Sequence, residues 1–266
     1  MDSYLEKALM KLAARWVGRC FHAAPSKAQW RQCRLVAHRG DQERGRLMEN
    51  SLAAFDRSLA AGVWGIELDL RWTRDHHPVV AHDRDLRRLF QSSEAIADMD
   101  LARLRRCYPR IPTLSQVIAR YGGRLHLMLE IKPASHVPWE RKGWILGQLL
   151  QSLSPGKDYH ILALDLPSLA ALGHLPSRTK LPIAQFNIPA FSREALARNY
   201  GGLCGHYLLI SRRRAARHGC QAQGVGLGFV DSWPVLRWVA ARGATWIFSN
   251  RAAELEGLRR TLLAAL

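Results

Sequence analysis

Short apolar runs alternate along most of this chain with longer segments whose apolar residues recur at helical spacing. The short runs predict strands at residues 35–38, 65–71, 125–131, 159–164, 181–185, 204–210, 224–229 and 246–249. The segments after them predict helices at residues 50–61, 113–120, 140–152, 166–172, 192–199, 212–218, 234–242 and 252–265. Eight strands, each followed by a helix, predict a single (β/α)8 barrel.

One connection departs from this regular pattern. The segment between Trp72 and Pro112 is unusually long and holds an extra apolar pair, Val79 and Val80, followed by His82. Long connections in compact domains are commonly functional. We therefore expect this segment to contribute to a site.

Residues 1–33 precede the first strand and predict an amphipathic helical extension to a barrel of residues 34–266. Apolar residues and a basic stripe each recur at helical spacing: Leu5, Leu9, Leu12, Trp16 and Cys20, and Lys7, Lys11, Arg15 and Arg19. One interpretation is a helix that caps the bottom of the barrel. The other is that residues 1–20 lie on an anionic membrane surface at the inner face of the membrane.

The composition is that of a globular protein, with 48% hydrophobic and 23% charged residues among 266. Basic residues interrupt the N-terminal apolar run, so no signal peptide is expected, and no later segment is apolar enough to predict a transmembrane helix. The five cysteines form no C-x-x-C pair, which argues against a disulfide scaffold and a zinc site. These features favour a cytoplasmic protein.

The net charge of +17 favours anionic partners. The two arginine-rich runs, at residues 103–106 and 212–217, lack an interleaved aromatic platform. They are therefore typical of solvated helix faces, and we expect no specific nucleic acid partner.

Three acidic residues are expected to meet at the mouth of the barrel. Glu67 and Asp69 stand two residues apart on the second predicted strand, and Glu130 and Lys132 have the same spacing on the third. Side chains two apart on a strand share a face, which is the interior of a barrel. Clustered buried carboxylates need a partner, and oxygen ligands favour one hard divalent cation, Mg²⁺ or Ca²⁺. The alternative is that the acidic residues pair with nearby arginines.

Two histidines are expected at the same end of the barrel. His38 ends the first predicted strand and His82 follows the Val79–Val80 pair. Beside a metal, such a pair can serve as base and acid for an alcohol leaving phosphorus. Arg39 carries a guanidinium suited to phosphate oxygens.

These residues stand in six short motifs: AHRG at 37–40, ENS at 49–51, GIELDLRWT at 65–73, PVVAHD at 78–83, IPTL at 111–114 and LEIKP at 129–133. In order and spacing they resemble the glycerophosphodiester phosphodiesterase family. The resemblance implies a TIM barrel that uses a metal to hydrolyse a glycerophosphodiester to sn-glycerol 3-phosphate and an alcohol. It leaves open whether water or the neighbouring glycerol hydroxyl attacks phosphorus.

Carried over residue by residue, the resemblance makes Glu67, Asp69 and Glu130 the metal ligands and His38 and His82 the acid–base pair. Arg39 and Lys132 would hold the phosphate, and Glu49 and Asn50 would lie near the site. The stretch from Arg84 to Arg110 lacks the insertion of Ca²⁺-binding periplasmic members, which favours Mg²⁺ over Ca²⁺ and a cytoplasmic location. Met48, Ala163, Leu164 and Asn250 depart from the family pattern, and most of these departures concern substrate identity.

Two other functions remain open. A lysophospholipase D or sphingomyelinase D-like phosphodiesterase acting at a membrane surface resembles the same fold and site. A non-catalytic basic barrel that binds phosphate or membrane is the alternative of another class. The sequence does not indicate an oligomeric state.

Overall fold

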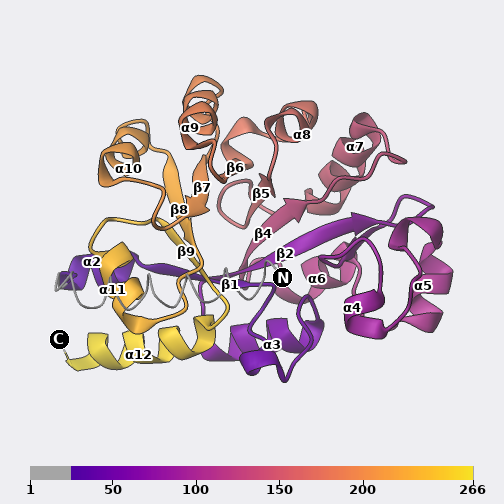
Figure 1. Cartoon of the computed structure of the whole chain (residues 1–266), viewed down its shortest axis with the longest axis horizontal. Coiled ribbons are helices and arrows are strands. Elements are labelled where there is room, and N and C mark those ends of the chain that lie inside the picture. Colours follow the sequence, from indigo (N-terminus) through magenta and orange to yellow (C-terminus); the bar gives the residue numbers. More distant parts are fainter. Residues whose placement is uncertain (1–24, 266) are drawn as a thin grey trace.

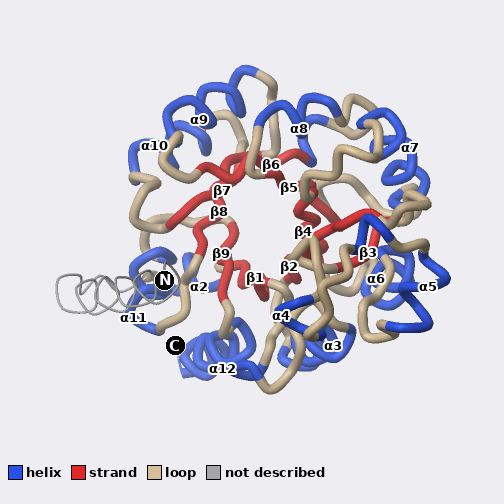
Figure 2. Tube along the Cα trace, turned by 45° about the vertical axis from the view of Figure 1, so that its right-hand side comes forward, coloured by secondary structure: helices blue, strands red, loops and turns tan. Residues whose placement is uncertain are grey.

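The computed structural model describes residues 25–265, and its strands close into the expected barrel (Figure 2). Eight parallel strands form the wall, because β1 pairs with β9 on one side and with β2 on the other. They are β1 (Arg34–His38), β2 (Gly65–Trp72), β4 (His126–Ile131), β5 (Tyr159–Ala163), β6 (Lys180–Ala184), β7 (Gly202–His206), β8 (Gly224–Gly228) and β9 (Trp246–Ser249).

One predicted strand was wrong in its extent. The seventh strand ends at His206, whereas the sequence pattern continues it to residue 210. The chain turns at once, with the Leu209 amide donating to the His206 carbonyl at 2.9 Å. The apolar residues Tyr207 and Ile210 are buried in that turn, which explains why they resemble a strand.

Eight helices follow the barrel strands and surround them (Figure 1). They are α3 (Leu52–Ala61), α6 (Leu114–Tyr121), α7 (Trp139–Leu150), α8 (Leu166–Ala171), α9 (Ile188–Ala197), α10 (Arg212–Gly219), α11 (Trp233–Ala240) and α12 (Ala252–Ala265). A 3-10 turn, Ser177–Thr179, precedes β6. The predicted alternation is confirmed, although α9 begins earlier than expected, with a proline in its first turn.

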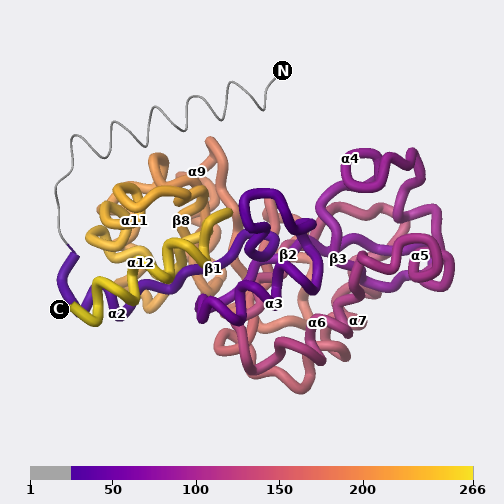
Figure 3. The backbone as a smooth tube through the Cα atoms, turned by 90° about the horizontal axis from the view of Figure 1, so that it is seen from below, coloured from indigo at the N-terminus to yellow at the C-terminus, as the bar shows by residue number. Residues whose placement is uncertain are grey.

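The long second connection is folded. It holds β3 (Pro78–Val80), α4 (Arg87–Phe90), the 3-10 turn Ile96–Asp98 and α5 (Leu101–Cys107). β3 pairs antiparallel with β2, and a separate apolar cluster that includes Val79, Leu86 and Leu104 stabilises the segment. In Figure 3 the α4–α5 segment extends away from the side of the barrel that carries α11 and α12. The connection therefore places His82, which follows β3, beside the mouth of the barrel.

The alternation of side chains along the strands divides the core into two layers. On β2, Ile66, Leu68 and Leu70 face outward and pack in the cluster between the strands and helices. Glu67 and Asp69, at the alternate positions, therefore face the barrel interior. Residues that include Val36, Met128, Leu181 and Trp246 form a separate apolar cluster that fills the barrel lower down.

A short helix, α2 (Lys27–Gln32), packs against the end of the barrel wall. Trp30 is buried and stacks on Trp233 with 5.2 Å between ring centroids, and the Trp30 carbonyl accepts from Arg259 at 2.7 Å. The predicted amphipathic segment at residues 1–20 lies outside the described residues. Within residues 25–265, no helix has the length and apolar character needed to cross a membrane.

A glycine sets the course of the chain after β1. Gly40 has φ +77°, and a Cβ atom there would lie 2.8 Å from both Ala54 Cβ and Phe55 Cδ1 of α3. Gly45, in the 3-10 turn Glu43–Gly45 of the same loop, has φ +91°, but a Cβ atom there would meet nothing within 4 Å. Substituting alanine at each of the two glycines therefore distinguishes the cost of backbone strain from the cost of steric overlap.

We expect Gly40→Ala to lower the free energy of unfolding by about 2–4 kcal/mol, since overpacking adds to the left-handed conformation. Gly45→Ala should lower the free energy of unfolding by only about 1 kcal/mol, because alanine there is disfavoured by the left-handed backbone conformation alone. Urea unfolding of both variants measures the difference. Equal losses would show that the approach of α3 to the loop is not a tight constraint.

Candidate metal and phosphate site

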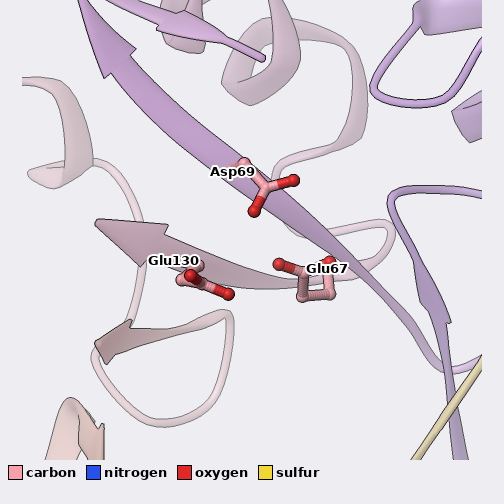
Figure 4. A group of neighbouring side chains, drawn as sticks. All are labelled: Glu67, Asp69 and Glu130. Carbon is pink, nitrogen blue, oxygen red and sulfur yellow. The ribbon is translucent and has the colours of Figure 1, made fainter. Parts of the chain in front are cut away.

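Three carboxylates face one another at the mouth of the barrel (Figure 4). Glu67 and Asp69 come from β2 and Glu130 from the neighbouring β4, where Asp69 and Glu130 are paired in register. All three residues are buried, and each offers an oxygen within 4.8 Å of the others. The structure therefore brings together the three residues that the sequence predicted as metal ligands.

The cluster perturbs the ionisation of its members. Burial, together with the charges of Asp69 and Glu130, raises the pKa of Glu67 well above its ordinary value. Burial also raises the pKa of Glu130, although the Lys132 ammonium opposes this. For Asp69, Lys132 and Arg39 outweigh the effect of burial and lower the pKa. Glu67 is thus the carboxylate with the least compensated charge.

Two cations partly neutralise the cluster. The Lys132 ammonium lies 2.8 Å from Asp69 Oδ1 and also contacts Glu130. Arg39 Nε lies 3.3 Å from Asp69 Oδ2. The alternative in which acidic residues pair with arginines therefore describes Asp69 in part. Within residues 25–265, the one hydrogen bond that Glu67 accepts is from the backbone N–H of Arg39, at 3.0 Å, and His38 Nε2 lies 3.9 Å from its Oε2.

The remaining charge and an unpaired oxygen fit a divalent cation. Glu67 Oε1 is buried and has no hydrogen-bond partner among the residues that the structure describes, so one carboxylate oxygen of the cluster is free to bind a cation. Three carboxylates against two side-chain cations leave a net negative charge in a buried position. Oxygen-only ligation of this kind suits Mg²⁺ or Ca²⁺. Glu67, Asp69 and Glu130 would hold the ion.

The loop after β1 holds Arg39 in an unusual backbone conformation. Arg39 and Asn50 have φ values of 58° and 54°, which are uncommon for residues with a Cβ. The Asn50 backbone N–H donates to the Arg39 carbonyl at 2.9 Å, and its side-chain amide donates to Asp69 at 2.7 Å. Such strain is concentrated at functional sites, where the surrounding contacts maintain it.

Glu49 orients arginines. Its carboxylate accepts from Arg39 Nη1 and Arg88 Nη1, each at 3.0 Å. Burial would raise the pKa of Glu49, but the two guanidinium groups outweigh it and lower the pKa. The predicted neighbours Glu49 and Asn50 are therefore both connected to the carboxylate cluster, through Arg39 and Asp69 respectively.

His38 has a defined tautomer. Asn250 Nδ2 donates to Asp231 Oδ2 at 2.8 Å, which turns Asn250 Oδ1 toward His38 Nδ1, also at 2.8 Å. Because Oδ1 can only accept, Nδ1 carries the hydrogen and Nε2 has the free lone pair. Burial and the Arg39 charge lower the pKa of His38, which favours this neutral ring.

His82 is held from two directions. Its Nδ1 lies 2.8 Å from Asp83 Oδ1, and Arg88 Nε donates to the other oxygen of Asp83 at 2.7 Å. Arg71 donates from Nη2 to the His82 carbonyl at 2.7 Å. Both histidines thus contact the protein through Nδ1, and His38 Nε2 lies 3.9 Å from Glu67 Oε2.

A cavity of about 420 Å³ opens over the carboxylate cluster. His38, Arg39, Glu67, His82, Glu130 and Lys132 line one side of it. Asp69, Asn50 and Glu49 lie behind this charged wall and contact the residues that form it. The arrangement can bind an anion, hold a cation and exchange protons within one space.

Comparisons with known proteins show what this part of the chain is similar to. Residues 38–155 match the model of the Glycerophosphoryl diester phosphodiesterase family. This part of the chain is therefore similar to the glycerophosphodiester phosphodiesterase family. All nine site residues that the sequence predicted lie within the matched segment.

Individual relatives agree with the family match. A glycerophosphodiester phosphodiesterase of Caldanaerobacter subterraneus is 34% identical over 110 residues, which are 37% of this chain and 44% of that protein. Glycerophosphodiester phosphodiesterase 1 of Homo sapiens is 26% identical over 163 residues, covering 53% of this chain and 49% of that protein. The chain spans about half the length of the curated relatives it matches.

Solved structures of the family share the fold. The Thermotoga maritima glycerophosphodiester phosphodiesterase has a TM-score of 0.73 and 20% identity, over 85% of this chain and 98% of that one. A phosphodiesterase of Oleispira antarctica, solved with the product sn-glycerol-3-phosphate, has a TM-score of 0.70 and 21% identity, over 84% and 95% of the two chains. The TIM barrel expected from the sequence is confirmed.

Sequence reasoning assigned no positioning role to the residues that orient the two histidines, although it singled out Asn250 as a departure from the family pattern. Asp231 and Asn250 lie beyond the segment that matches the glycerophosphodiester phosphodiesterase family, and no sequence spacing connects them with His38. Asp83 stands next to His82 within a matched motif, so its adjacency to a candidate catalytic histidine was an available signal.

The tautomer of His38 can be tested without turnover. Ring ¹⁵N NMR should show Nδ1 protonated and Nε2 unprotonated in the neutral ring. Asn250→Ala should produce a mixture of tautomers, because the acceptor is removed. Asn250→Asp should keep the tautomer and raise the pKa of His38, since a nearby carboxylate stabilises the imidazolium.

The solvated His77 provides the control, because its signals should be unchanged in both variants. A single, unaltered His38 tautomer in Asn250→Ala would show that Asn250 does not orient the ring.

Proposed function

We propose that this chain hydrolyses a glycerophosphodiester to sn-glycerol 3-phosphate and an alcohol, with one divalent cation, Mg²⁺ favoured over Ca²⁺, held by Glu67, Asp69 and Glu130. The observation that carries the proposal is the single cavity into which two histidines and a buried carboxylate cluster both open. The family match over residues 38–155 and the product-bound relative support the substrate class.

The charged wall supplies what the reaction needs. Arg39 and Lys132 line the cavity and bind the phosphoryl oxygens, on which negative charge increases as the new bond to phosphorus forms. When bound, the divalent cation would supply Lewis-acid stabilisation and orientation of the phosphate. Hydrogen bonds between Arg39 and Glu67, Glu49 and Asn50 hold its charge in place before the substrate arrives.

The two histidines transfer the protons. One ring accepts at Nε2 the proton of the attacking water or glycerol hydroxyl, and the other donates a proton to the departing alcohol oxygen as its bond to phosphorus breaks. His38 suits the accepting role, because Asn250 fixes its hydrogen on Nδ1 and burial lowers its pKa. His82 then suits the donating role, with its ring anchored to Asp83.

The domain division at residues 33 and 34 also belongs to the proposal. Packing of α2 on the barrel supports docking of residues 25–33, where Gln29 donates to the Ala241 carbonyl at 3.1 Å. The basic stripe of residues 1–20 supports peripheral contact with anionic lipid at the inner face of the membrane.

We expect His38→Ala and His82→Ala each to lower kcat by roughly 10²–10⁴, because each removes a proton-transfer group. His77→Ala, in the turn before β3, is the matched control and should keep full activity. Release of sn-glycerol 3-phosphate from glycerophosphocholine with Mg²⁺, Ca²⁺ or chelator measures the effect, and chelator should abolish turnover in every variant.

Circular dichroism of the variants excludes unfolding as the cause. Retention of most activity by either histidine variant would contradict the assignment. Phosphate binding without hydrolysis of any diester would favour the non-catalytic barrel.

A further inference from the structure

One guanidinium joins two carboxylates that come from separate segments beside the mouth of the barrel. Arg88 lies on α4, in the long connection after β3. Its Nε donates to Asp83 Oδ2 at 2.7 Å, and its Nη1 and Nη2 donate to the two oxygens of Glu49, with Nη1 at 3.0 Å from Oε2. A planar guanidinium can serve two carboxylates in this way, whereas an ammonium group has no such fixed geometry.

Each of these carboxylates also holds a residue assigned to the reaction. Asp83 Oδ1 lies 2.8 Å from His82 Nδ1, and Glu49 Oε1 accepts from Arg39 Nη1 at 3.0 Å. Arg88 is thus the middle of a continuous series of polar contacts. The series begins at the ring assigned to the departing alcohol and ends at the guanidinium assigned to the phosphate. We call Asp83, Arg88 and Glu49 the Arg88 bridge.

The bridge connects two parts of the site that otherwise pack separately. Within residues 25–265, every hydrogen bond between the loop of residues 39–51 and the segment of residues 74–112 runs from Arg88 to Glu49. A cavity of about 20 Å³ lies where the two parts meet, lined by Met48 of the loop and by Leu86 and Phe90 of the segment, among others. Apolar packing between the two parts is therefore incomplete, and the bridge fixes how they meet.

The members of the bridge keep one another charged. Burial raises the pKa of Glu49, but Arg88 and Arg39 outweigh it and lower the pKa. Burial likewise opposes ionisation of Asp83, whose pKa is lowered by hydrogen bonds from His82 and Arg88. The two carboxylates in turn raise the pKa of Arg88. Each contact of the bridge is therefore charge-assisted, and such contacts fix the orientation of both partners.

We propose that Arg88 is a positioning residue that couples the His82 ring to the Arg39 guanidinium. This inference rests on the proposed function, because both coupled groups act in that reaction. Arg71 holds the backbone of His82 through its carbonyl, whereas the ring depends on Asp83 and therefore on the bridge. An exposed ion pair that only stabilised the fold would contribute little and would leave the reaction unchanged. Positioning instead makes proton transfer and phosphate binding depend on one side chain.

The test compares two variants of Arg88 with a control on the same helix. With Mg²⁺ and glycerophosphocholine, Arg88→Ala and Arg88→Lys should each lower kcat roughly 10²-fold, since small displacements of a reacting group have effects of this size. Calorimetric binding of inorganic phosphate with Mg²⁺ should weaken roughly tenfold in both, the size of one lost contact to a charged group. Arg87→Ala is the matched control and should keep both values, because the Arg87 side chain is 72% exposed and its Nε lies 3.9 Å from Asp85.

Added guanidinium ion distinguishes positioning from damage to the fold. The Arg88 side chain is 47% exposed, so its truncation leaves a space that a small cation can enter. Guanidinium, at concentrations that leave the circular dichroism unchanged, should raise kcat of Arg88→Ala roughly tenfold by replacing the forked contacts. Methylammonium, which has no fork, should not. Neither ion should change kcat of the wild type or of Arg87→Ala.

A readout without turnover keeps this inference separate from the proposed function. In ring ¹⁵N NMR, the neutral ring of wild-type His82 should carry its hydrogen on Nδ1, because the Asp83 carboxylate can only accept. Arg88→Ala should give a mixture of tautomers, and guanidinium should return it to one.

The outcomes separate the two proposals. Hydrolysis by the wild type with unchanged kcat and phosphate binding in Arg88→Ala overturns the inference and leaves the proposed function standing. Full activity in Arg88→Lys, or full rescue by methylammonium, also overturns it by assigning Arg88 the role of a bare charge. No hydrolysis of any diester by the wild type overturns the proposed function, and an unchanged His82 spectrum with unchanged phosphate binding in Arg88→Ala then overturns the inference as well.

Discussion

The site depends on one constraint, the close approach of three buried carboxylates at the mouth of the barrel. Each offers an oxygen within 4.8 Å of the others. Without partners they would repel one another and lose hydration, so the fold surrounds them with compensating groups. Lys132 contacts two of them, Arg39 reaches Asp69, and Asn50 donates to the same carboxylate. The compensation is incomplete at Glu67, whose unpaired oxygen is the feature that a divalent cation would satisfy.

The backbone around the cluster follows from the same constraint. Aligning the Arg39 N–H with Glu67 and its guanidinium with Asp69 requires a left-handed residue directly after β1. Gly40 then lets the chain pass against α3 where a side chain would overlap it. The regular geometry of parallel strands brings the carboxylates together, because β2 and β4 present their inward side chains in register.

The barrel divides its chemistry along the chain. Charged groups come from β1, β2, β4 and the segment after β3, whereas the ends of β5 to β8 supply apolar side chains. The family match covers the first group and ends at residue 155. The segment that matches the family and the residues of the apolar side of the cavity thus lie in different parts of the sequence.

This division also explains what could be predicted from sequence. The strands and helices followed from periodicity, and Glu67, Asp69 and Glu130 followed from their spacing on strands, because both depend on local geometry. The extent of β7 could not be predicted, since buried Tyr207 and Ile210 in a turn have the same apolar pattern as a strand. The pairing of His38 with Asn250 could not be predicted either, because it joins β1 to β9 only when the barrel closes.

The central claim is that the carboxylate cluster is a cation site. Thermal unfolding of the wild type and Glu67→Gln, at neutral pH with chelator and then with Mg²⁺, tests it most directly. The raised pKa of Glu67 means that the folded state favours its protonated form, so its ionisation at neutral pH opposes folding. The account predicts that Glu67→Gln is at least as stable as the wild type in chelator and that Mg²⁺ raises the melting temperature of the wild type alone. An equal Mg²⁺ effect on both proteins, or none on either, would contradict it.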